Sequence, residues 1–348
     1  MNVFYSEEAY NQLNTHINQY KYSKIFILTD TNTNECCTPI FLPELATHIP
    51  IETIEIEAGE ENKTIDTCVQ LWNVLNELGA DRKSLIIALG GGVITDIGGF
   101  VASVYKRGIH YINVPTSLLA MVDAAIGGKN GVDLGSAKNQ VGTINPAQMV
   151  VVDFRFLDTL PPVQVRSGYA EMLKHGLIQD KAYWELLQNF SNINTNQIDE
   201  LIITSIDIKN QIINQDPTEE GIRKALNFGH TLGHAIEGYC IENPNRNTLL
   251  HGEAIAIGMI LESYISYKKN YISQEDYQQI KNTFKQIYPF VEFDKTEIEQ
   301  IIQLTTFDKK NENGKIYFTL LDTIGNVSIN QQVATELIYE AFDDYYKD

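Results

Sequence analysis

Strand-like and helix-like segments alternate along the first half of this chain, and this alternation limits its fold more than any other feature. Short β-branched runs that end in turn residues occupy 24–30, 84–92 and 109–116. A segment with helical period occupies 64–79 and ends at Gly79. Because strands that alternate with helices usually pair in parallel, the pattern predicts an α/β fold with a mostly parallel, Rossmann-like sheet.

The pattern changes beyond the Pro161-Pro162 pair, where helical signals dominate and strands become scarce. One late exception, 314–321, predicts a lone strand or one arm of a hairpin. A chain of 348 residues also exceeds the usual size of a single core. We therefore predict an α/β domain over 1–160 and a largely helical domain over 161–348.

Composition excludes several classes of protein. Acidic residues outnumber basic ones by 45 to 26 and no Lys/Arg cluster stands out, so nucleic-acid binding is not expected. The first residues lack a signal-peptide pattern and no apolar run is long enough to span a membrane, which predicts a cytoplasmic protein without a membrane partner. The four cysteines form no CxxC pair and are expected to be reduced. An anionic ligand would have to be held by a few local cations.

Two glycine-rich stretches are candidates for nucleotide or phosphate binding. The first, 88–100, follows a strand and opens a helix, where backbone N–H groups can hold a phosphate. It lacks the usual GxGxxG spacing and the acidic strand end Asp30 precedes it, so a plain glycine turn is the alternative. The second, 114–142, surrounds Asp123 with apolar residues. A buried carboxylate needs partners, which favours a site over a solvated loop.

Two histidines four residues apart, His230 and His234, stand among glycines and apolar residues. A helix over 223–239 would place Arg223, Asn227 and both histidines on one arc, opposite an apolar stripe. A solvated stripe in an acidic protein is usually Glu, Lys and Asp, and the flanking glycines indicate close packing, so we favour a functional stripe. Spacing alone makes the two histidines a candidate metal pair.

Four more residues on predicted helices are candidates for a functional role. Glu171 and Lys174 share a face, either as a surface ion pair or as the wall of a site. Lys209 stands where the helical period calls for an apolar residue, and it either snorkels to solvent or faces an anion. His251 precedes an apolar helix; alone it would be a cap or a packed residue, but an acidic residue with two or three histidines from different helices suits a catalytic zinc site.

Five ordered segments, spanning about 88 to 260, resemble the 3-dehydroquinate synthases: GGGVITDIGGFVASVYKRG, VPTSLLAMVDAAIGGKNGVD, SGYAEMLKHGLI, RKALNFGHTLGHAIE and HGEAIAIGM. The resemblance implies a carbon–oxygen lyase of the shikimate pathway of aromatic amino-acid biosynthesis. Such a homodimer converts 3-deoxy-D-arabino-heptulosonate 7-phosphate to 3-dehydroquinate and phosphate. It also implies transient oxidation by NAD⁺ without net consumption, and one divalent metal ion, Zn²⁺ or Co²⁺.

The resemblance implies a role for each matching residue. The metal ligands would be Glu171, His230 and His251. The catalytic residues would be Asp123, Lys174, Asn227 and His234. The substrate-binding residues would be Arg107, Lys129, Asn139, Lys209, Arg223, Lys309 and Lys310. The NAD⁺-binding residues would be Asp30, Asn32, Glu60, Lys63, Gly91, Gly92, Val93, Ile94, Asp96, Thr116, Ser117, Lys129, Lys138, Phe156, Thr159 and Leu160.

Within these groups the resemblance implies finer contacts. Lys209 and Arg223 would hold the substrate carboxylate, and Arg107 would reach the site of the neighbouring subunit. The substrate phosphate would be held by Lys129, Asn139, His234 and one of Lys309 or Lys310.

Three other activities fit parts of the pattern. A related sugar-phosphate cyclase would share the fold, the metal and NAD⁺, but the implied carboxylate contacts Lys209 and Arg223 favour 3-dehydroquinate synthase. A metal-dependent polyol or alcohol dehydrogenase would instead produce NADH in net terms. A non-catalytic NAD-binding regulator would be expected to lose a metal ligand or Lys174, and none is lost.

Overall fold

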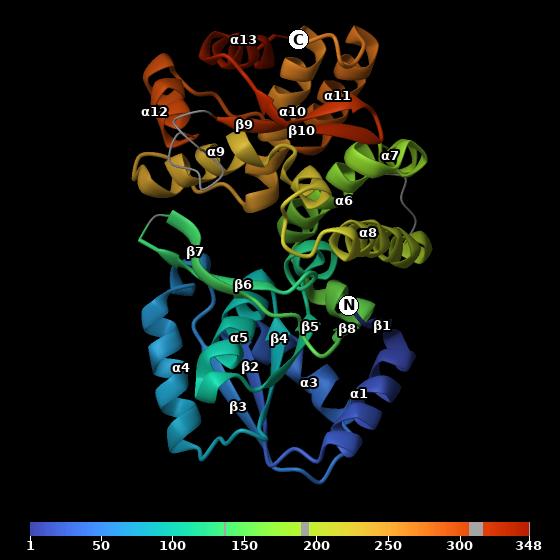
Figure 1. Cartoon of the computed structure of the whole chain (residues 1–348), viewed down its shortest axis with the longest axis vertical. Helices are drawn as coiled ribbons and strands as arrows, with labels where there is room; N and C mark the ends of the chain where they lie inside the picture. Colours follow the sequence, from blue (N-terminus) through green and yellow to red (C-terminus); the bar gives the residue numbers. More distant parts are fainter. Residues whose placement is uncertain (136, 189–194, 306–315, 348) are drawn as a thin grey trace. The chain divides into compact units, whose positions relative to one another are not determined.

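The computed structural model of this chain describes residues 1–135, 137–188, 195–305 and 316–347. The chain divides into two units, residues 1–165 and 166–348, and each is considered separately (Figure 1). The division falls in the first turn of α6 (Pro162–Gln179). Among the described residues, no helix combines the length and apolar character needed to cross a bilayer.

A six-stranded sheet forms the centre of the first unit, in the order β1-β8-β5-β4-β2-β3. Its neighbouring strands all pair in parallel, which confirms the predicted parallel α/β fold. The strands are β1 (Val3–Tyr5), β2 (Ile25–Asp30), β3 (Ile51–Ile56), β4 (Leu85–Gly90), β5 (His110–Pro115) and β8 (Val150–Val152). The helices are α1 (Ser6–Tyr20), α2 (Thr31–Cys36), α3 (Thr38–Phe41), α4 (Ile65–Glu77) and α5 (Gly92–Val104).

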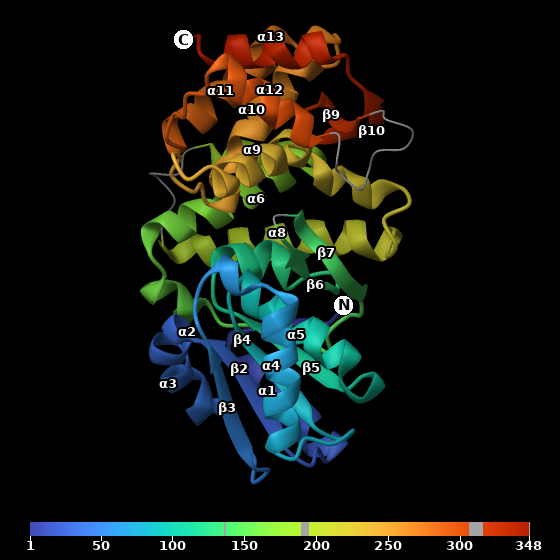
Figure 2. The ribbon, with the colours of Figure 1, turned by 90° about the vertical axis from the view of Figure 1, so that its left-hand side faces the viewer.

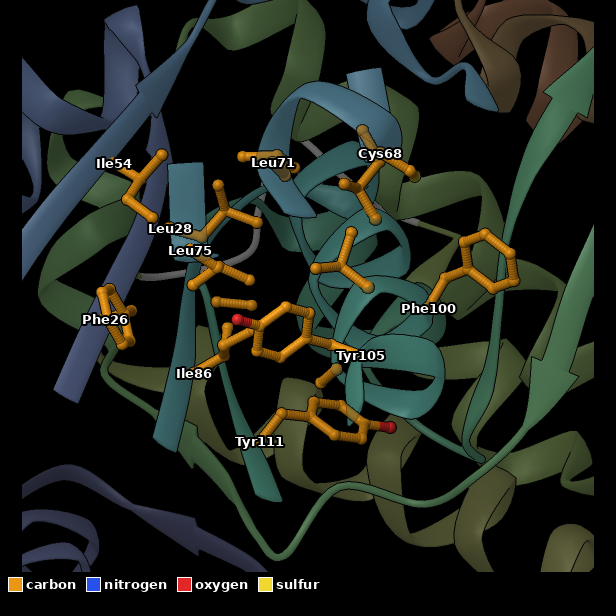
Figure 3. Close-up of a cluster of buried hydrophobic side chains, with 14 of the residues drawn as sticks. Phe26, Leu28, Ile54, Cys68, Leu71, Leu75, Ile86, Phe100, Tyr105 and Tyr111 are labelled. Carbon is orange, nitrogen blue, oxygen red and sulfur yellow. The ribbon is translucent and has the colours of Figure 1, made fainter. Parts of the chain in front are cut away.

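One face of this sheet packs against α4 and α5 (Figure 3). Phe26 and Ile86 extend from the strands toward Leu71 of α4 and Phe100 of α5, and all four are buried. The central strand β4 is buried along its whole length, as expected for a parallel strand covered on both faces. The core therefore holds the carboxyl ends of the strands in fixed positions.

The described residues of the segment 114–142 form regular structure rather than a solvated loop. A π-helical turn (Ala120–Ala124) precedes an antiparallel hairpin of β6 (Lys129–Leu134) and β7 (Ala137–Ile144). Asp123, in the turn, is partly buried as predicted.

Helices dominate the second unit, as predicted for the chain beyond residue 160. They are α6, α7 (Lys181–Leu187), α8 (Thr195–Gln215), α9 (His230–Glu242), α10 (His251–Lys268), α11 (Gln274–Ile287), α12 (Lys295–Thr305) and α13 (Thr335–Tyr345). The late strand is β9 (Tyr317–Thr323), and it pairs antiparallel with β10 (Asn326–Gln332). Of the two predicted alternatives for this segment, the hairpin arm is therefore correct.

The prediction of one continuous helix over 223–239 is wrong. A short 3-10 helix (Ile222–Asn227) comes first, and α9 begins only at His230. Between them Phe228 is extended and Gly229 has φ 77°, a left-handed conformation that glycine adopts at little cost. Arg223 and Asn227 therefore do not lie on the same helix as the two histidines.

Helices α9 and α10 lie side by side and approach closely at glycines (Figure 2). A Cβ atom on Gly258 would lie 2.0 Å from the Gly229 oxygen and 2.7 Å from the Gly233 nitrogen. A Cβ atom on Gly233 would lie 3.0 Å from the Ile255 Cα. These distances confirm that the glycines beside His230 mark a close helix contact.

Gly258→Ala should destabilise the second unit by about 1–3 kcal/mol, because the new methyl group has no room against the backbone of α9. Gly238→Ala is the matched control on α9, since a Cβ atom there meets nothing within 4 Å. That change should stabilise the helix by about 0.5–1 kcal/mol. Urea unfolding followed by circular dichroism compares the midpoints, and an unchanged midpoint for Gly258→Ala would contradict the close contact.

Candidate active site

Residues expected to bind the cofactor follow the carboxyl ends of the parallel strands, where open α/β sheets bind their ligands. The strand order changes direction between β2 and β4, since β3 lies on one side of β2 whereas β4, β5 and β8 lie on the other. Asp30 is the last residue of β2. The residues that follow the strand ends are Asn32 after β2, Glu60 and Lys63 after β3, Gly91 to Asp96 after β4, Thr116 and Ser117 after β5, and Phe156, Thr159 and Leu160 after β8.

The turn after β4 is tight. Gly91 is extended, Gly92 opens α5, and a Cβ atom on Gly92 would lie 3.3 Å from the Ala124 Cβ. The N-terminus of α5 therefore presents backbone N–H groups at the carboxyl edge of the sheet. Asp30, at the end of β2, caps α2, and its Oδ1 accepts a hydrogen bond of 2.8 Å from the Thr33 nitrogen.

Lys63 is buried and joins residues from three separate motifs into one polar network. Its Nζ lies 2.7 Å from both Asp96 Oδ2 and Asn139 Oδ1. Burial disfavours the Lys63 ammonium, but the carboxylates of Asp96 and Glu60 hold its pKa above the usual range. Lys138, on β7, pairs with Glu60 Oε1 at 3.1 Å. The structure thus brings together five residues that the sequence could only place in separate segments.

Asp133, which the sequence did not single out, ties the hairpin to this network. Its Oδ1 accepts a hydrogen bond of 2.6 Å from the Asn139 nitrogen, and its own nitrogen donates to the Lys63 carbonyl at 2.9 Å. Asn139 has φ 52°, so its backbone is in the left-handed region. The Asp133 carboxylate stabilises this conformation, and nothing in the local sequence distinguishes it from an ordinary turn aspartate.

Glu171 is the centre of a second cluster, in the helical unit. Its side chain is fully buried and forms an ion pair with Lys174 on the same helix, so the surface alternative for this pair is wrong. Glu171 Oε1 lies 3.4 Å from His230 Nε2 and 3.6 Å from His251 Nε2. Burial alone would raise the pKa of Glu171, but Lys174 and His251 hold it well below its usual range.

Both histidines direct Nε2 toward Glu171 because their other ring nitrogens are engaged. His230 Nδ1 lies 3.0 Å from the Phe228 oxygen, and His251 Nδ1 lies 3.2 Å from Glu237 Oε2. A carbonyl or carboxylate partner places the ring proton on Nδ1 and leaves the Nε2 lone pair available to a metal ion. The sequence did not single out Glu237 as part of the site.

The two histidines differ in charge. Burial and the nearby Lys174 lower the pKa of His230 well below its usual value, so the ring is neutral. Burial would also lower the pKa of His251, but the carboxylates of Glu237 and Glu171 raise it to about 10. Without a metal ion the two carboxylates therefore favour a positively charged His251 ring, and an ion bound at Nε2 would replace the proton there.

His234 belongs to the same cluster. Ligand atoms of His230, His234 and His251 all lie within 4.8 Å of one another, and two are buried only in part. Besides the ion pair of Glu171 Oε2 with Lys174, the Nε2 atoms of two histidines face the carboxylate, which fits a carboxylate that would bind an ion. One carboxylate with imidazole nitrogens is the ligand type of catalytic zinc. The residues present therefore fit a divalent metal ion.

The cations expected to bind the substrate carboxylate are also buried. Lys209 is 6% exposed, which favours the buried alternative over snorkelling, and Arg223 is 2% exposed. Arg223 Nη1 donates a hydrogen bond of 2.7 Å to the Pro217 oxygen. Asn227 Nδ2 donates to Glu219 Oε1 at 3.1 Å, so Glu219 is another neighbour that the sequence did not reveal.

Two further residues expected to bind the substrate, Arg107 and Lys129, belong to the first unit. Arg107 follows α5 and is exposed, with φ 72°, and Lys129 is exposed at the start of β6. Lys309 and Lys310 lie outside the described residues. The contacts of all these residues with a substrate stay predictions.

The fold and the second cluster together define a class, the two-part α/β enzymes in which a Rossmann-like unit precedes a helical unit with a candidate metal centre. The family model for the N-terminal part of 3-dehydroquinate synthase matches residues 53–167, and that for the C-terminal part matches residues 168–311. A 3-dehydroquinate synthase from Parabacteroides distasonis is 42% identical over 345 residues, which cover 99% of this chain and 97% of the relative. The chain belongs to the 3-dehydroquinate synthase family.

Solved structures of other cyclases share the fold. A 2-deoxy-scyllo-inosose synthase complexed with carbaglucose-6-phosphate, NAD⁺ and Co²⁺ is 26% identical with a TM-score of 0.84, covering 98% of this chain and 95% of that one. A 2-epi-5-epi-valiolone synthase from Streptomyces hygroscopicus, with NAD⁺ and Zn²⁺ bound, is 24% identical with a TM-score of 0.85, covering 99% and 96%. At that identity the second likeness supports the fold alone.

His251→Ala should abolish stoichiometric zinc binding, because it removes one of the nitrogens directed at Glu171. His234→Ala should retain zinc, since the expected role of His234 is to face the substrate phosphate. His48→Ala, an exposed histidine outside the cluster, is the matched control. Zinc content after dialysis, measured by mass spectrometry, separates these cases. Full zinc content in folded His251→Ala protein would contradict the ligand assignment.

Proposed function

We propose that this chain converts 3-deoxy-D-arabino-heptulosonate 7-phosphate to 3-dehydroquinate and phosphate, as a phosphate-eliminating lyase of the shikimate pathway. The observation that carries the proposal is the cluster of the buried Glu171, Lys174 and His230 with the partly buried His251, in a member of this family. The proposal includes NAD⁺ and one Zn²⁺ or Co²⁺ ion as cofactors. It also includes a cytoplasmic homodimer, in which Arg107 reaches the neighbouring subunit's site.

The metal ion would be held by Glu171, His230 and His251. When bound, it would polarise the substrate hydroxyl that is oxidised by NAD⁺. Lys174 is buried beside the Glu171 carboxylate, so its ammonium would donate a hydrogen bond to that hydroxyl while balancing the negative charge of the ligand. Asp123 and Asn227 would orient the same hydroxyl. Burial of this cluster limits access of water to the reacting carbon.

Recognition of the substrate's two anionic groups would depend on local cations. The chain carries a net charge of −19, so its overall field repels an anion. Lys209 and Arg223 are buried, and ion pairs are stronger in such low-dielectric surroundings than in water. These two residues would hold the carboxylate. His234 with Lys129 and Asn139 would hold the phosphate.

NAD⁺ would lie at the carboxyl edge of the parallel sheet. The Gly91-Gly92 turn would face the pyrophosphate, since the N-terminus of α5 favours negative charge. The network of Glu60, Lys63 and Asp96 would hold polar groups of the cofactor near the strand ends. A dinucleotide at the point where the strand order changes direction is the usual arrangement in open α/β sheets.

The test is phosphate release from the heptulosonate phosphate by purified protein, with and without NAD⁺ and a metal chelator. Release should require both NAD⁺ and the metal, and NADH should not accumulate. Turnover only of a carboxylate-free sugar phosphate would support the related cyclase instead. Net production of NADH from a polyol, followed by absorbance, would support the dehydrogenase.

Lys209→Ala should raise the KM for the heptulosonate phosphate by about 10- to 100-fold, as expected when a hydrogen bond to a charged group is lost. The value of kcat should change less, because this contact lies away from the reacting hydroxyl. Lys295→Ala, an exposed lysine of the same unit, is the control. Steady-state kinetics gives both constants, and an unchanged KM would place Lys209 outside the carboxylate pocket.

A further inference from the structure

Two buried glutamates of the helical unit have no role in the function proposed above. Glu237 lies on α9 with 2% of its surface exposed, and Glu262 lies on α10 with 0% exposed. A carboxylate loses its hydration when it is buried, so each needs compensating contacts. Each carboxylate contacts the neighbouring helix, close to a candidate metal ligand of that helix.

Glu237 contacts the histidine that begins α10. Its Oε2 lies 3.2 Å from His251 Nδ1, on the side of the ring opposite Nε2. Since Nε2 is the nitrogen directed at Glu171, the Glu237 carboxylate fixes both the ring orientation and the position of the ring proton. Glu237 follows His230 on α9 by about two helical turns, which puts both side chains on one face of that helix.

Glu262 contacts the backbone that begins α9. Its Oε2 accepts a hydrogen bond of 2.7 Å from the Gly229 nitrogen, and its Oε1 accepts one of 3.1 Å from the Leu232 nitrogen. N–H groups in the first turn of a helix have no partner within the helix, and a negative charge there is favourable. The two backbone nitrogens lie on either side of His230 in the sequence. The Nδ1 atom of His230 contacts the carbonyl of Phe228, just before the turn. Glu262 thereby holds the backbone that orients the His230 ring.

We propose that Glu237 and Glu262 are reciprocal positioning residues of the metal centre: the carboxylate on α9 orients the histidine ligand of α10, and the carboxylate on α10 orients the histidine ligand of α9. The inference deepens the proposed function and rests on it for the presence of the metal ion. The close approach at Gly258 lets each glutamate reach the other helix, because a side chain at this position would separate the two helices. Metal affinity is thereby linked to the packing of α9 on α10.

The test compares folded variants for cobalt affinity, by competition with a chelator, and for the visible absorption spectrum of bound Co²⁺. Glu237→Ala should weaken affinity by about 10- to 100-fold, the usual effect of removing a partner of a ligating histidine. Glu237→Gln should recover part of this loss, since its amide oxygen still accepts the Nδ1 proton. Both variants should shift the cobalt spectrum, because ring orientation changes the ligand field.

Replacement by glutamine should affect cobalt affinity differently at Glu262 than at Glu237. Both of its oxygens accept N–H groups, so Glu262→Gln would turn an amide NH₂ toward a backbone donor and should weaken cobalt affinity about as much as Glu262→Ala. Thermal unfolding of the metal-free variants identifies a temperature at which each is folded. Affinities and spectra are then measured below that temperature, so a loss of fold is not mistaken for a loss of positioning.

Glu297→Gln is the matched control. Glu297 accepts a hydrogen bond from Tyr239 of α9 and pairs with Arg246, but it contacts no candidate ligand. This variant should lose stability without a change in cobalt affinity or spectrum. If folded Glu237→Ala and Glu262→Ala proteins keep the wild-type cobalt affinity and spectrum, reciprocal positioning is wrong, whereas the proposed function is unaffected. A wild-type chain that binds neither Co²⁺ nor Zn²⁺ would overturn the proposed function itself.

Discussion

The buried carboxylate of Glu171 is the constraint on which the helical unit depends. An isolated carboxylate without solvent is too costly to keep charged, so positive or metal-binding partners must surround it. Lys174 comes from the next turn of the same helix, whereas His230 and His251 come from α9 and α10. Three helices must therefore bring side chains to one point, which fixes their relative positions within the unit more strictly than apolar packing alone.

Helices α9 and α10 can bring their histidines close to Glu171 because they pack closely on each other at glycines, which have no side chains. Gly258 lies against the backbone of Gly229 and Gly233, where no methyl group would fit. The short separation brings the start of α9 within reach of Glu262 and the start of α10 within reach of Glu237. Glycine is a poor helix former, so its presence in both helices lowers their intrinsic stability in exchange for the contact. The same glycines therefore determine both how α9 packs on α10 and where the candidate metal ligands lie.

Much of the fold could be predicted because the signals are local. The strands over 24–30, 84–92 and 109–116 and the helix over 64–79 each depend on the period of their own residues, and the structure contains all four. Parallel pairing then places the segment after each strand at one edge of the sheet. The assignment of distant residues such as Lys63 and Asp96 to one cofactor site came instead from the family resemblance, and the structure shows that the two side chains form an ion pair.

The break before α9 could not be predicted, because its cause is distant in the sequence. The left-handed turn at Gly229 is stabilised by the Glu262 carboxylate, which accepts hydrogen bonds from the Gly229 and Leu232 nitrogens, 33 and 30 residues away in the sequence. A helical period that continues through 223–239 carries no trace of either contact. Glu237 and Glu262 were missed for the same reason, since a glutamate within a helix is usually solvated. The individual metal ligands came from the family resemblance, because spacing alone would pair His230 with His234.

The three expected metal ligands belong to one unit, so metal binding can be measured separately from turnover. Glu171, His230, His251 and both positioning glutamates lie within residues 166–348. The cofactor network of Glu60, Lys63 and Asp96 lies within residues 1–165. Under the proposed assignment, metal affinity would depend on the packing of helices within one unit, whereas turnover would also require groups from the other. A change in α6, α9 or α10 would then weaken metal binding, and a change that impairs only turnover could lie in either unit.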